Sequence, residues 1–331
     1  MGDLAMTSRW AERKKEKNHA MRDYFVVFLA LGTVVVTGAP LRAQEVPSTY
    51  QQVLTTLDKK GDYKANVFKI NIPRNDLNVT VGGEATPTPF GFGGWIAMTK
   101  GDKGMDVMMG DLVLLEDEVN PVMSALLENG LEVTALHNHF FWETPRIFYM
   151  HVHGYGNPAE LARKVKPAIE LIGKIAPRTR ATRRSPANMA PVVRGKLDTA
   201  GLDGIIGYLG EQNGPVYKIT IGRDDLELKE TGATINSRMG LNTWAAFFGT
   251  DAKAMVAGDV AMLENEVTPV LKALRAHGLD VVAIHHHMTG SRPMIIFLHY
   301  WGKGPATKLA TGFKAALNEL GKSRSTMPKE H

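Results

Sequence analysis

The sequence contains no cysteine and only one apolar run that stands out. Without cysteine, disulfides, thiolate metal ligands and a lipid-modified N-terminal cysteine are all excluded. The apolar run, residues 25–36, has 12 residues and is too short to cross a bilayer of about 30 Å as a helix. We therefore expect no stable membrane anchor, and a fold stabilised by the burial of apolar side chains.

Several common catalytic signatures are also missing. The sequence has no Gly-x-Ser-x-Gly or Ser-x-x-Lys, which removes the usual serine-nucleophile patterns. It has no His-Glu-x-x-His, no P-loop and no Gly-x-Gly-x-x-Gly. Any chemistry must therefore come from residues brought together by the fold.

Residues 1–43 have the pattern of a secretory signal peptide. Basic residues precede the apolar run, and Ala39 and Ala43 offer small-residue cleavage positions beyond it. We predict a periplasmic or secreted protein, with an uncleaved N-terminal anchor as the alternative. Removing this segment lowers the formal net charge from +5 to +2, so the charge does not indicate a nucleic-acid partner.

The rest of the chain carries one pattern twice. Ala135-Leu136-His137-Asn138-His139 and the segment 145–151 return 148 residues later as Ala283-Ile284-His285-His286-His287 and the segment 293–299. A repeat of this length defines the organisation of the chain. We predict a signal peptide at 1–43, a first copy at 47–174, a linker at 175–198, a second copy at 199–322 and a tail at 323–331.

Hydrophobic periodicity predicts strands interleaved with helices in each copy. In the first copy we expect strands at 67–72, 77–81, 95–98, 107–115, 131–139 and 146–153, and helices at 53–57, 116–129 and 158–172. In the second we expect strands at 217–221, 244–247, 256–262, 280–287 and 294–300, and helices at 264–277 and 306–320. The strand at 107–115 is expected to be broken or bulged near Gly110-Asp111. This is an α+β fold, and we predict two tandem ferredoxin-like units related by a pseudo-twofold axis.

These motifs resemble the LppY/LpqO family of exported bacterial proteins, a domain of unknown function. The matching pattern is Gly-Asp before Glu-x-Glu-Val-x-Pro-Val, then Gly-Leu, Ala-(Leu/Ile)-His-x-His and Pro-x-Ile-x-(Tyr/Phe)-x-His, twice in this order. The resemblance implies export and a doubled domain, and it assigns no catalytic residue. Named mycobacterial members are lipoproteins, whereas this chain lacks the cysteine that would be lipidated.

Six of the eleven histidines fall at corresponding positions in the two copies: His137, His139, His151, His285, His287 and His299. Residues two apart in a strand share a face, so each His-x-His pair can offer two imidazoles to one cation. We expect a divalent metal ion, with zinc first, although copper, nickel and iron accept the same ligands.

The spacing of these histidines limits which of them can share an ion. A hairpin centred near residue 142 would place His137 opposite Ile147, and His151 roughly 13 Å away at about 3.3 Å per residue. The set around His137 and His139 would then need a carboxylate such as Glu118, or His299 of the other copy. Asp111 and Asp259 could also supply carboxylates, but we expect them to cap turns or helices.

The first copy has more ionisable groups near its His-x-His pair than the second, where Ser291 and Met294 replace Glu143 and Arg146. We therefore predict an exported metal-dependent hydrolase of small esters or lactones, with acyl-homoserine lactones (quorum quenching) as one conjecture. Glu118 or Glu143 would be the general base, and Arg146 would stabilise the developing oxyanion. The aromatic residues 140–142 would either form an apolar wall for the substrate or pack between the copies.

Two other functions are compatible with the same residues. One is a non-catalytic periplasmic or secreted protein that binds a small ligand or a metal ion. The other is a purely structural duplication whose histidines hydrogen-bond within the sheets. For the hydrolase and for the non-catalytic binding protein, the expected partner is a small molecule or an ion, with no nucleic acid. A homo-oligomer is compatible with the sequence.

Overall fold

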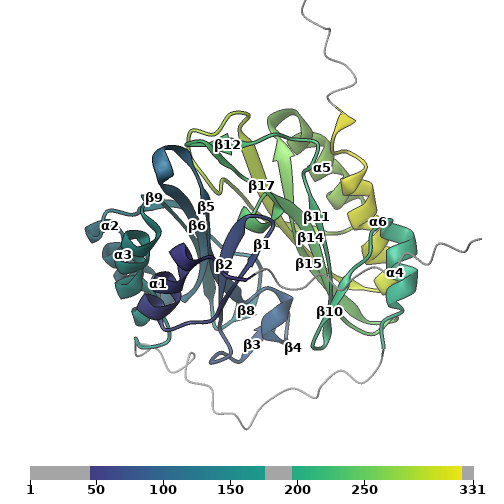
Figure 1. Ribbon diagram of the computed structural model, residues 1–331. Helices are drawn as coiled ribbons and strands as arrows, with labels where there is room; N and C mark the ends of the chain where they lie inside the picture. The colour runs from purple at the N-terminus through teal and green to yellow at the C-terminus, as the bar shows by residue number, and fades with distance from the viewer. Residues whose placement is uncertain (1–44, 176–195, 323–331) are drawn as a thin grey trace, which may run out of the picture. The chain divides into compact units, whose positions relative to one another are not determined.

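Two six-stranded antiparallel sheets, one from each copy of the repeat, form the framework of the computed structural model (Figure 1). The structure describes residues 45–175 and 196–322. The predicted signal peptide, most of the predicted linker and the predicted tail lie outside these residues. Both sheets belong to the compact unit that begins at Ala43.

The two sheets have the same strand order. The first has the order β1 (Gly61–Lys64), β2 (Val67–Pro73), β5 (Gly93–Lys100), β6 (Asp106–Leu115), β9 (Ile147–Gly156), β7 (Glu132–His137). The second has the order β10 (Glu211–Asn213), β11 (Val216–Gly222), β14 (Asn242–Gly249), β15 (Ala254–Leu263), β17 (Ile295–Gly304), β16 (Asp280–His285). In both sheets, one strand (β9 or β17) lies between two strands that a helix connects.

Three helices accompany each sheet: α1 (Ser48–Leu57), α2 (Glu116–Glu128) and α3 (Pro158–Leu171), then α4 (Thr199–Ile206), α5 (Glu264–Ala276) and α6 (Ala306–Leu317). Figure 1 shows each set gathered on its own sheet. Short strands make two smaller sheets: β3 (Val79–Val81), β4 (Glu84–Thr86) and β8 (Glu143–Thr144) in the first copy, β12 (Lys229–Glu230) and β13 (Ala233–Thr234) in the second.

The helix α2 shows how the local sequence builds each copy. Its buried residues include Val119, Val122 and Leu126, spaced three and four apart on one face. Glu116 and two further acids in the first turn suit the positive end of the helix dipole. Gly130, with φ 70°, ends the helical path in a conformation that favours glycine.

Each sheet has two buried faces. One face packs under the helices of its own copy, in apolar clusters that include Ile96 and Met150 in the first copy and Phe247 and Leu298 in the second. The other face contacts the other copy, since two further clusters combine side chains from both. Residues on these facing surfaces are therefore placed to form a site shared by the two copies.

The structure confirms a mixed α/β chain with antiparallel sheets and a duplicated domain. The expected break in the 107–115 strand is wrong: β6 pairs without interruption through Gly110 and Asp111. A side chain at Gly110 would meet the side chain of Val152 at 2.7 Å and the carbonyl oxygen of Trp95 at 2.9 Å, so close packing explains the glycine. The irregularity lies instead in β7, between Val133 and Ala135, and again in β16, between Val281 and Ala283.

Candidate metal centre

The register of β7 against β9 brings three first-copy histidines together. In this register His137 pairs with Tyr149 and not with Ile147. His151 is therefore a diagonal neighbour, and its ring centroid lies 5.1 Å from that of His137. The expected separation of roughly 13 Å between these residues is wrong, because it assumed a regular hairpin, whereas β8 leaves the loop to pair with β3.

The six paired histidines form one cluster between the two sheets, which we call the histidine centre: His137, His139, His151, His285, His287 and His299. The closest contacts between its histidine rings join one copy to the other. The centroids are 3.7 Å apart for His137 and His285, 3.6 Å for His139 and His299, and 4.1 Å for His151 and His287. The expectation that His299 could reach the His-x-His pair of the other copy is confirmed.

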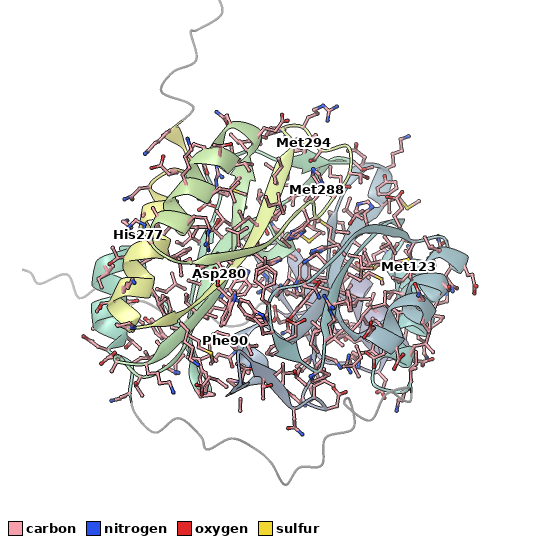
Figure 2. The ribbon with its side chains drawn as sticks, turned by 180° about the vertical axis from the view of Figure 1, so that it is seen from behind. Phe90, Met123, His277, Asp280, Met288 and Met294 are labelled. Carbon is pink, nitrogen blue, oxygen red and sulfur yellow. The ribbon has the colours of Figure 1, made fainter. Side chains whose placement is uncertain are left out.

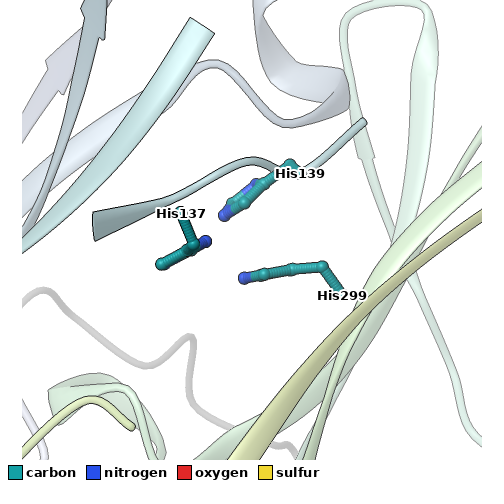
Figure 3. A group of neighbouring side chains, drawn as sticks. All are labelled: His137, His139 and His299. Carbon is teal, nitrogen blue, oxygen red and sulfur yellow. The ribbon is translucent and has the colours of Figure 1, made fainter. Parts of the chain in front are cut away.

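Three overlapping groups, drawn from this cluster and the nearby Asp259, each have their ligand atoms within 4.8 Å of one another. They are His137, His139 and His299; His137, His151 and His285; and Asp259, His285 and His287. Figure 3 shows the nitrogen atoms of the first group directed toward a common point. The first and third groups share no residue, so the centre contains donors for two ions.

Backbone carbonyls orient several of these rings. The Nδ1 atoms of His137, His285 and His299 lie 3.4, 3.3 and 3.3 Å from the carbonyl oxygens of Asn138, His286 and Gly258. A carbonyl can only accept, so Nδ1 carries the hydrogen and Nε2 keeps its lone pair. These three Nε2 atoms are buried and have no hydrogen-bond partner among the described residues. This is the tautomer in which a histidine binds a metal through Nε2.

Burial keeps the centre uncharged at neutral pH. It lowers the pKa of His137 to about 4 and, together with neighbouring imidazoles, lowers the pKa of each of the other five rings well below 6.5. Neutral imidazole is the form that ligates metals, so no proton has to be displaced from these rings.

Asp111 and Asp259 lie in the middle of β6 and β15, and neither caps a turn or helix, so that expectation is wrong. Each pairs across the ladder with a histidine of the centre, His151 and His299 respectively. Asp259 Oδ2 is 3.7 Å from His287 Nε2. Burial raises the pKa of the Asp111 carboxyl to about 8, and burial plus the nearby Asp111 raises that of Asp259 well above its usual value. A bound cation would reverse this preference and favour both carboxylates.

Two lysines near these aspartates were not found by sequence analysis. The Nζ atoms of Lys69 and Lys218 each lie 4.1 Å from a ring centroid, of Trp95 and Trp244 respectively. Burial lowers the pKa of Lys69 to about 7 and that of Lys218 to about 8. The two lysines occupy corresponding positions in the two copies, with the same offset as the two tryptophans, and this correspondence was the signal in the sequence that could have revealed them. It did not suggest a site, because lysine in a strand is usually exposed.

Glu118 lies in a structural ion pair outside the histidine centre. Its carboxylate accepts hydrogen bonds from the Arg74 guanidinium at 2.6 and 3.1 Å and from the backbone N–H groups of Leu115 and Gly173 at 2.8 and 2.7 Å. Its side chain is fully buried. A carboxylate with all these donors is poorly placed to take a proton from water, and Glu118 belongs to none of the three ligand groups. Glu266 and Arg223 repeat the arrangement in the second copy.

Glu143 and Arg146 line a pocket of about 480 Å³ together with Asn138 and the aromatic residues Phe140, Phe141 and Trp142. We call it the loop pocket. Asp280 and Val282 of the second copy complete it, and Figure 2 labels Asp280. Asn138 and Phe140 are the chain neighbours of His139, so the loop pocket lies against the segment that carries this histidine. Burial raises the pKa of the Glu143 carboxyl.

His153 makes a different contact between the copies. Its Nε2 lies 2.6 Å from a carboxylate oxygen of Glu230 and its Nδ1 3.6 Å from one of Glu132. Although burial lowers the pKa of His153, these carboxylates raise it above its ordinary value. Because the two carboxylates face opposite ring nitrogens, they form an ion pair with the imidazolium and do not converge on one cation.

The histidine centre is nearly closed to solvent. Its six side chains belong to residues between 2% and 9% exposed. His139 stacks on Tyr149 and His287 on Phe297, with centroids 3.2 and 3.4 Å apart. Such a site suits tight ion binding better than the entry of an organic substrate.

The fold and the site together define a doubled α/β protein with a histidine centre shared by its two copies. The chain belongs to the family described as Domain of Unknown Function (DUF1259), whose model matches residues 51–171 and 200–319. No curated protein matches this chain. Along the described ranges, no helix is long and apolar enough to span a membrane.

Two solved structures are similar to this chain. EtuB from Clostridium kluyveri has 9% identity and a TM-score of 0.20, with 81% of this chain and 92% of that chain covered. A trimeric bacterial microcompartment shell protein, PduB, has 10% identity and a TM-score of 0.19, with 79% and 92% covered. At these TM-scores neither carries an argument about this protein.

Proposed function

We propose that this protein binds divalent transition-metal ions, zinc first, at the histidine centre. The observation that carries the proposal is that three buried, neutral imidazoles, those of His137, His285 and His299, have Nε2 atoms without a partner among the described residues and Nδ1 atoms that face backbone carbonyls. Histidine nitrogens with one carboxylate are a donor set that zinc, copper and nickel accept. We propose one ion at His137, His139 and His299 and a second at Asp259, His285 and His287.

Elemental analysis tests this proposal directly. Protein purified without added metal, or reloaded with Zn²⁺ after chelation, is expected to hold up to two ions per chain. His139→Ala and His287→Ala are each expected to lose one. His286→Ala is the matched control, because His286 lies between two proposed ligands but is exposed. Fewer than one ion per chain after reloading, or equal loss in the control, contradicts the proposal.

A second candidate function is the hydrolysis of small esters or lactones, acyl-homoserine lactones among them. It is supported by the loop pocket, which places Glu143 and Arg146 beside the segment carrying His139. Glu143 would take a proton from the attacking water as the water oxygen bonds to the carbonyl carbon, and Arg146 would stabilise the oxyanion. Glu143 would then return the proton to the departing alkoxide oxygen as the acyl C–O bond breaks. A bound metal ion would supply a water of lowered pKa. We place this function second because the histidines themselves are nearly closed to solvent.

The hydrolase proposal has a separate test. The reloaded wild type is expected to open lactones at a rate that Glu143→Gln and Arg146→Met both reduce, without a change in metal content. Glu118 has no catalytic role in this proposal. If the protein binds metal but turns over no ester or lactone, the hydrolase proposal is contradicted and only the metal-binding proposal remains.

We also propose the setting in which this site operates. The signal-like N-terminus supports export to the periplasm or outside the cell, and the motif pattern supports membership of the LppY/LpqO group. Each copy is proposed to be a ferredoxin-like unit, with β9 or β17 inserted in a β–α–β crossover, and the matching strand orders support a pseudo-twofold relation. The expected partners are a small molecule or ion, with no nucleic acid, in a monomer or homo-oligomer.

A further inference from the structure

The loop pocket has the size and lining of a ligand site in its own right. Its volume of about 480 Å³ falls in the range typical of small-molecule sites, about 300–1,000 Å³. The loop of the first copy supplies six of its residues, and β16 of the second copy supplies Asp280 and Val282. The corresponding loop of the second copy has Gly290, Ser291 and Met294 in place of Trp142, Glu143 and Arg146, and Met294 is labelled in Figure 2.

Trp142 is held in a backbone conformation that favours glycine. Its φ is 55°, and the corresponding residue of the second copy, Gly290, has φ 75°. A bulky residue in this region is strained, whereas glycine is not. The two copies share the turn, and only the first keeps a large side chain there. Such an outlier is an indication of function, because strain is retained where the side chain has a role.

The tryptophan is also exposed and fixed in place. It is 69% exposed, and its neighbour Phe141 is 40% exposed. The Trp142 carbonyl accepts a hydrogen bond from the Gly82 N–H at 3.2 Å, and its ring lies edge-on to Trp301 with centroids 5.9 Å apart. The next residues pair with β3. The ring is thus presented to solvent by a rigid loop, at little entropic cost to binding.

The polar groups of the loop pocket are balanced in charge and rich in acceptors. Glu143 accepts a hydrogen bond from the Ile147 N–H at 3.4 Å through Oε1, while its buried Oε2 has no partner among the residues described. Arg146 provides an exposed guanidinium, and Asp280 is paired with Arg275 at 2.6 Å. A strongly charged ligand would find no net opposite charge. A neutral ligand that donates hydrogen bonds would satisfy Glu143.

We propose that the loop pocket binds a pyranose sugar. The electron-rich faces of Trp142 and Phe141 attract the polarised C–H groups on one face of the ring. The Glu143 carboxylate accepts a hydrogen bond from a ring hydroxyl, and Arg146 donates to a ring or hydroxyl oxygen. Binding requires neither a metal ion in the histidine centre nor hydrolysis, so it stands or falls separately from the proposed function.

The experiment is a titration of the full chain, kept metal-free with a chelator, with glucose, galactose, N-acetylglucosamine and their β-1,4 disaccharides. Tryptophan fluorescence and calorimetry are read together. Saturable binding of at least one sugar is expected, in the millimolar range. Glu143→Gln and Trp142→Gly are each expected to weaken it at least tenfold, and Tyr208→Ala, which removes an exposed aromatic side chain elsewhere, to leave it unchanged.

The melting temperature of Trp142→Gly separates a binding role from a packing role. Glycine relieves the strained φ, so the variant is expected to melt at the wild-type temperature or above it while losing the sugar. A lower melting temperature assigns the ring to packing and overturns the proposal. Absence of saturable binding with every sugar, or binding that survives Trp142→Gly, overturns it as well.

Discussion

The imidazole rings of His137 and His285, one from each copy, are stacked with their centroids 3.7 Å apart. Two imidazolium ions at this separation would repel strongly, because little water is present to screen them. The pair is therefore stable only when neutral. The same holds for the whole histidine centre, where burial and neighbouring rings both lower the pKa values.

The metal-free protein is expected to lose stability as the pH falls from 6.5 toward 4, the interval between the ordinary and the lowered pKa of His137. In this interval the unfolded chain binds more protons at the six histidines than the folded chain does, so the free energy of unfolding increases with pH. For His137 alone the change is on the order of 3 kcal/mol at most.

Asp111, Asp259, Glu143 and His153 act in the opposite direction, because their pKa values are raised in the fold, but they are four groups against six. Denaturant unfolding in chelator across this interval measures the sum. A stability that is constant or increases toward acid pH contradicts the assignment of neutral, buried rings.

Asp259→Asn is expected to weaken binding of the second ion, of which Asp259 is a proposed ligand, by at least the roughly 10–100-fold that loss of a group outside the ligand set costs. The metal-free variant is expected to be at least as stable as the wild type, because the amide avoids burying a charge. The amide oxygen can still accept a hydrogen bond from the Leu298 N–H, which lies 3.2 Å from Oδ1 of Asp259 in the wild type. Calorimetric titration with Zn²⁺ and unfolding in chelator give the two readouts. Asp224→Asn, at an exposed position, should change neither.

Glu118→Gln is expected to destabilise the fold by roughly 3 kcal/mol, because it leaves the buried Arg74 guanidinium with reduced compensation. Arg74 is 2% exposed and Glu118 fully buried. Metal content should not change, and Glu116→Gln, on the exposed side of the same helix turn, should be nearly neutral in both respects. A Glu118→Gln protein that keeps its stability but loses metal would return Glu118 to the ligand set.

Gly110→Ala is expected to cost about 1–3 kcal/mol, as overpacked cores do, because the new methyl group would meet Val152 and the Trp95 carbonyl below 3.0 Å. Gly93→Ala in the neighbouring strand meets nothing within 4 Å and serves as the control. Thermal unfolding of both variants measures the difference. Equal stabilities would mean that Gly110 is not there for close packing.

The duplication, the main helices and the central strands could be predicted because they rest on local periodicity and on a long exact offset. The pairing of His137 with Tyr149 could not, because it depends on β8 leaving the loop for β3. That feature leaves no pattern in the residues themselves. A two-residue error in register was enough to separate His151 from a cluster to which it belongs.

The sequence predicted which types of residue form the site better than it predicted the role of each residue. The histidines followed from their spacing in two strands. Glu118 was misjudged because a carboxylate at the start of a helix looks available until its partner, Arg74, is seen 44 residues away in the chain. Lys69 and Asp111 were missed or misassigned because such residues are usually exposed, and only the contact between the sheets shows that they are half-buried.

Ligand groups that span the two copies also bear on how such a chain can change over time. In a symmetric pair of separate subunits, every substitution appears on both sides of the shared centre. Joining the copies in one polypeptide removes that constraint, so one loop can acquire Trp142, Glu143 and Arg146 while its counterpart keeps Gly290, Ser291 and Met294. The histidines retain their paired arrangement, and the surroundings are free to specialise on one side.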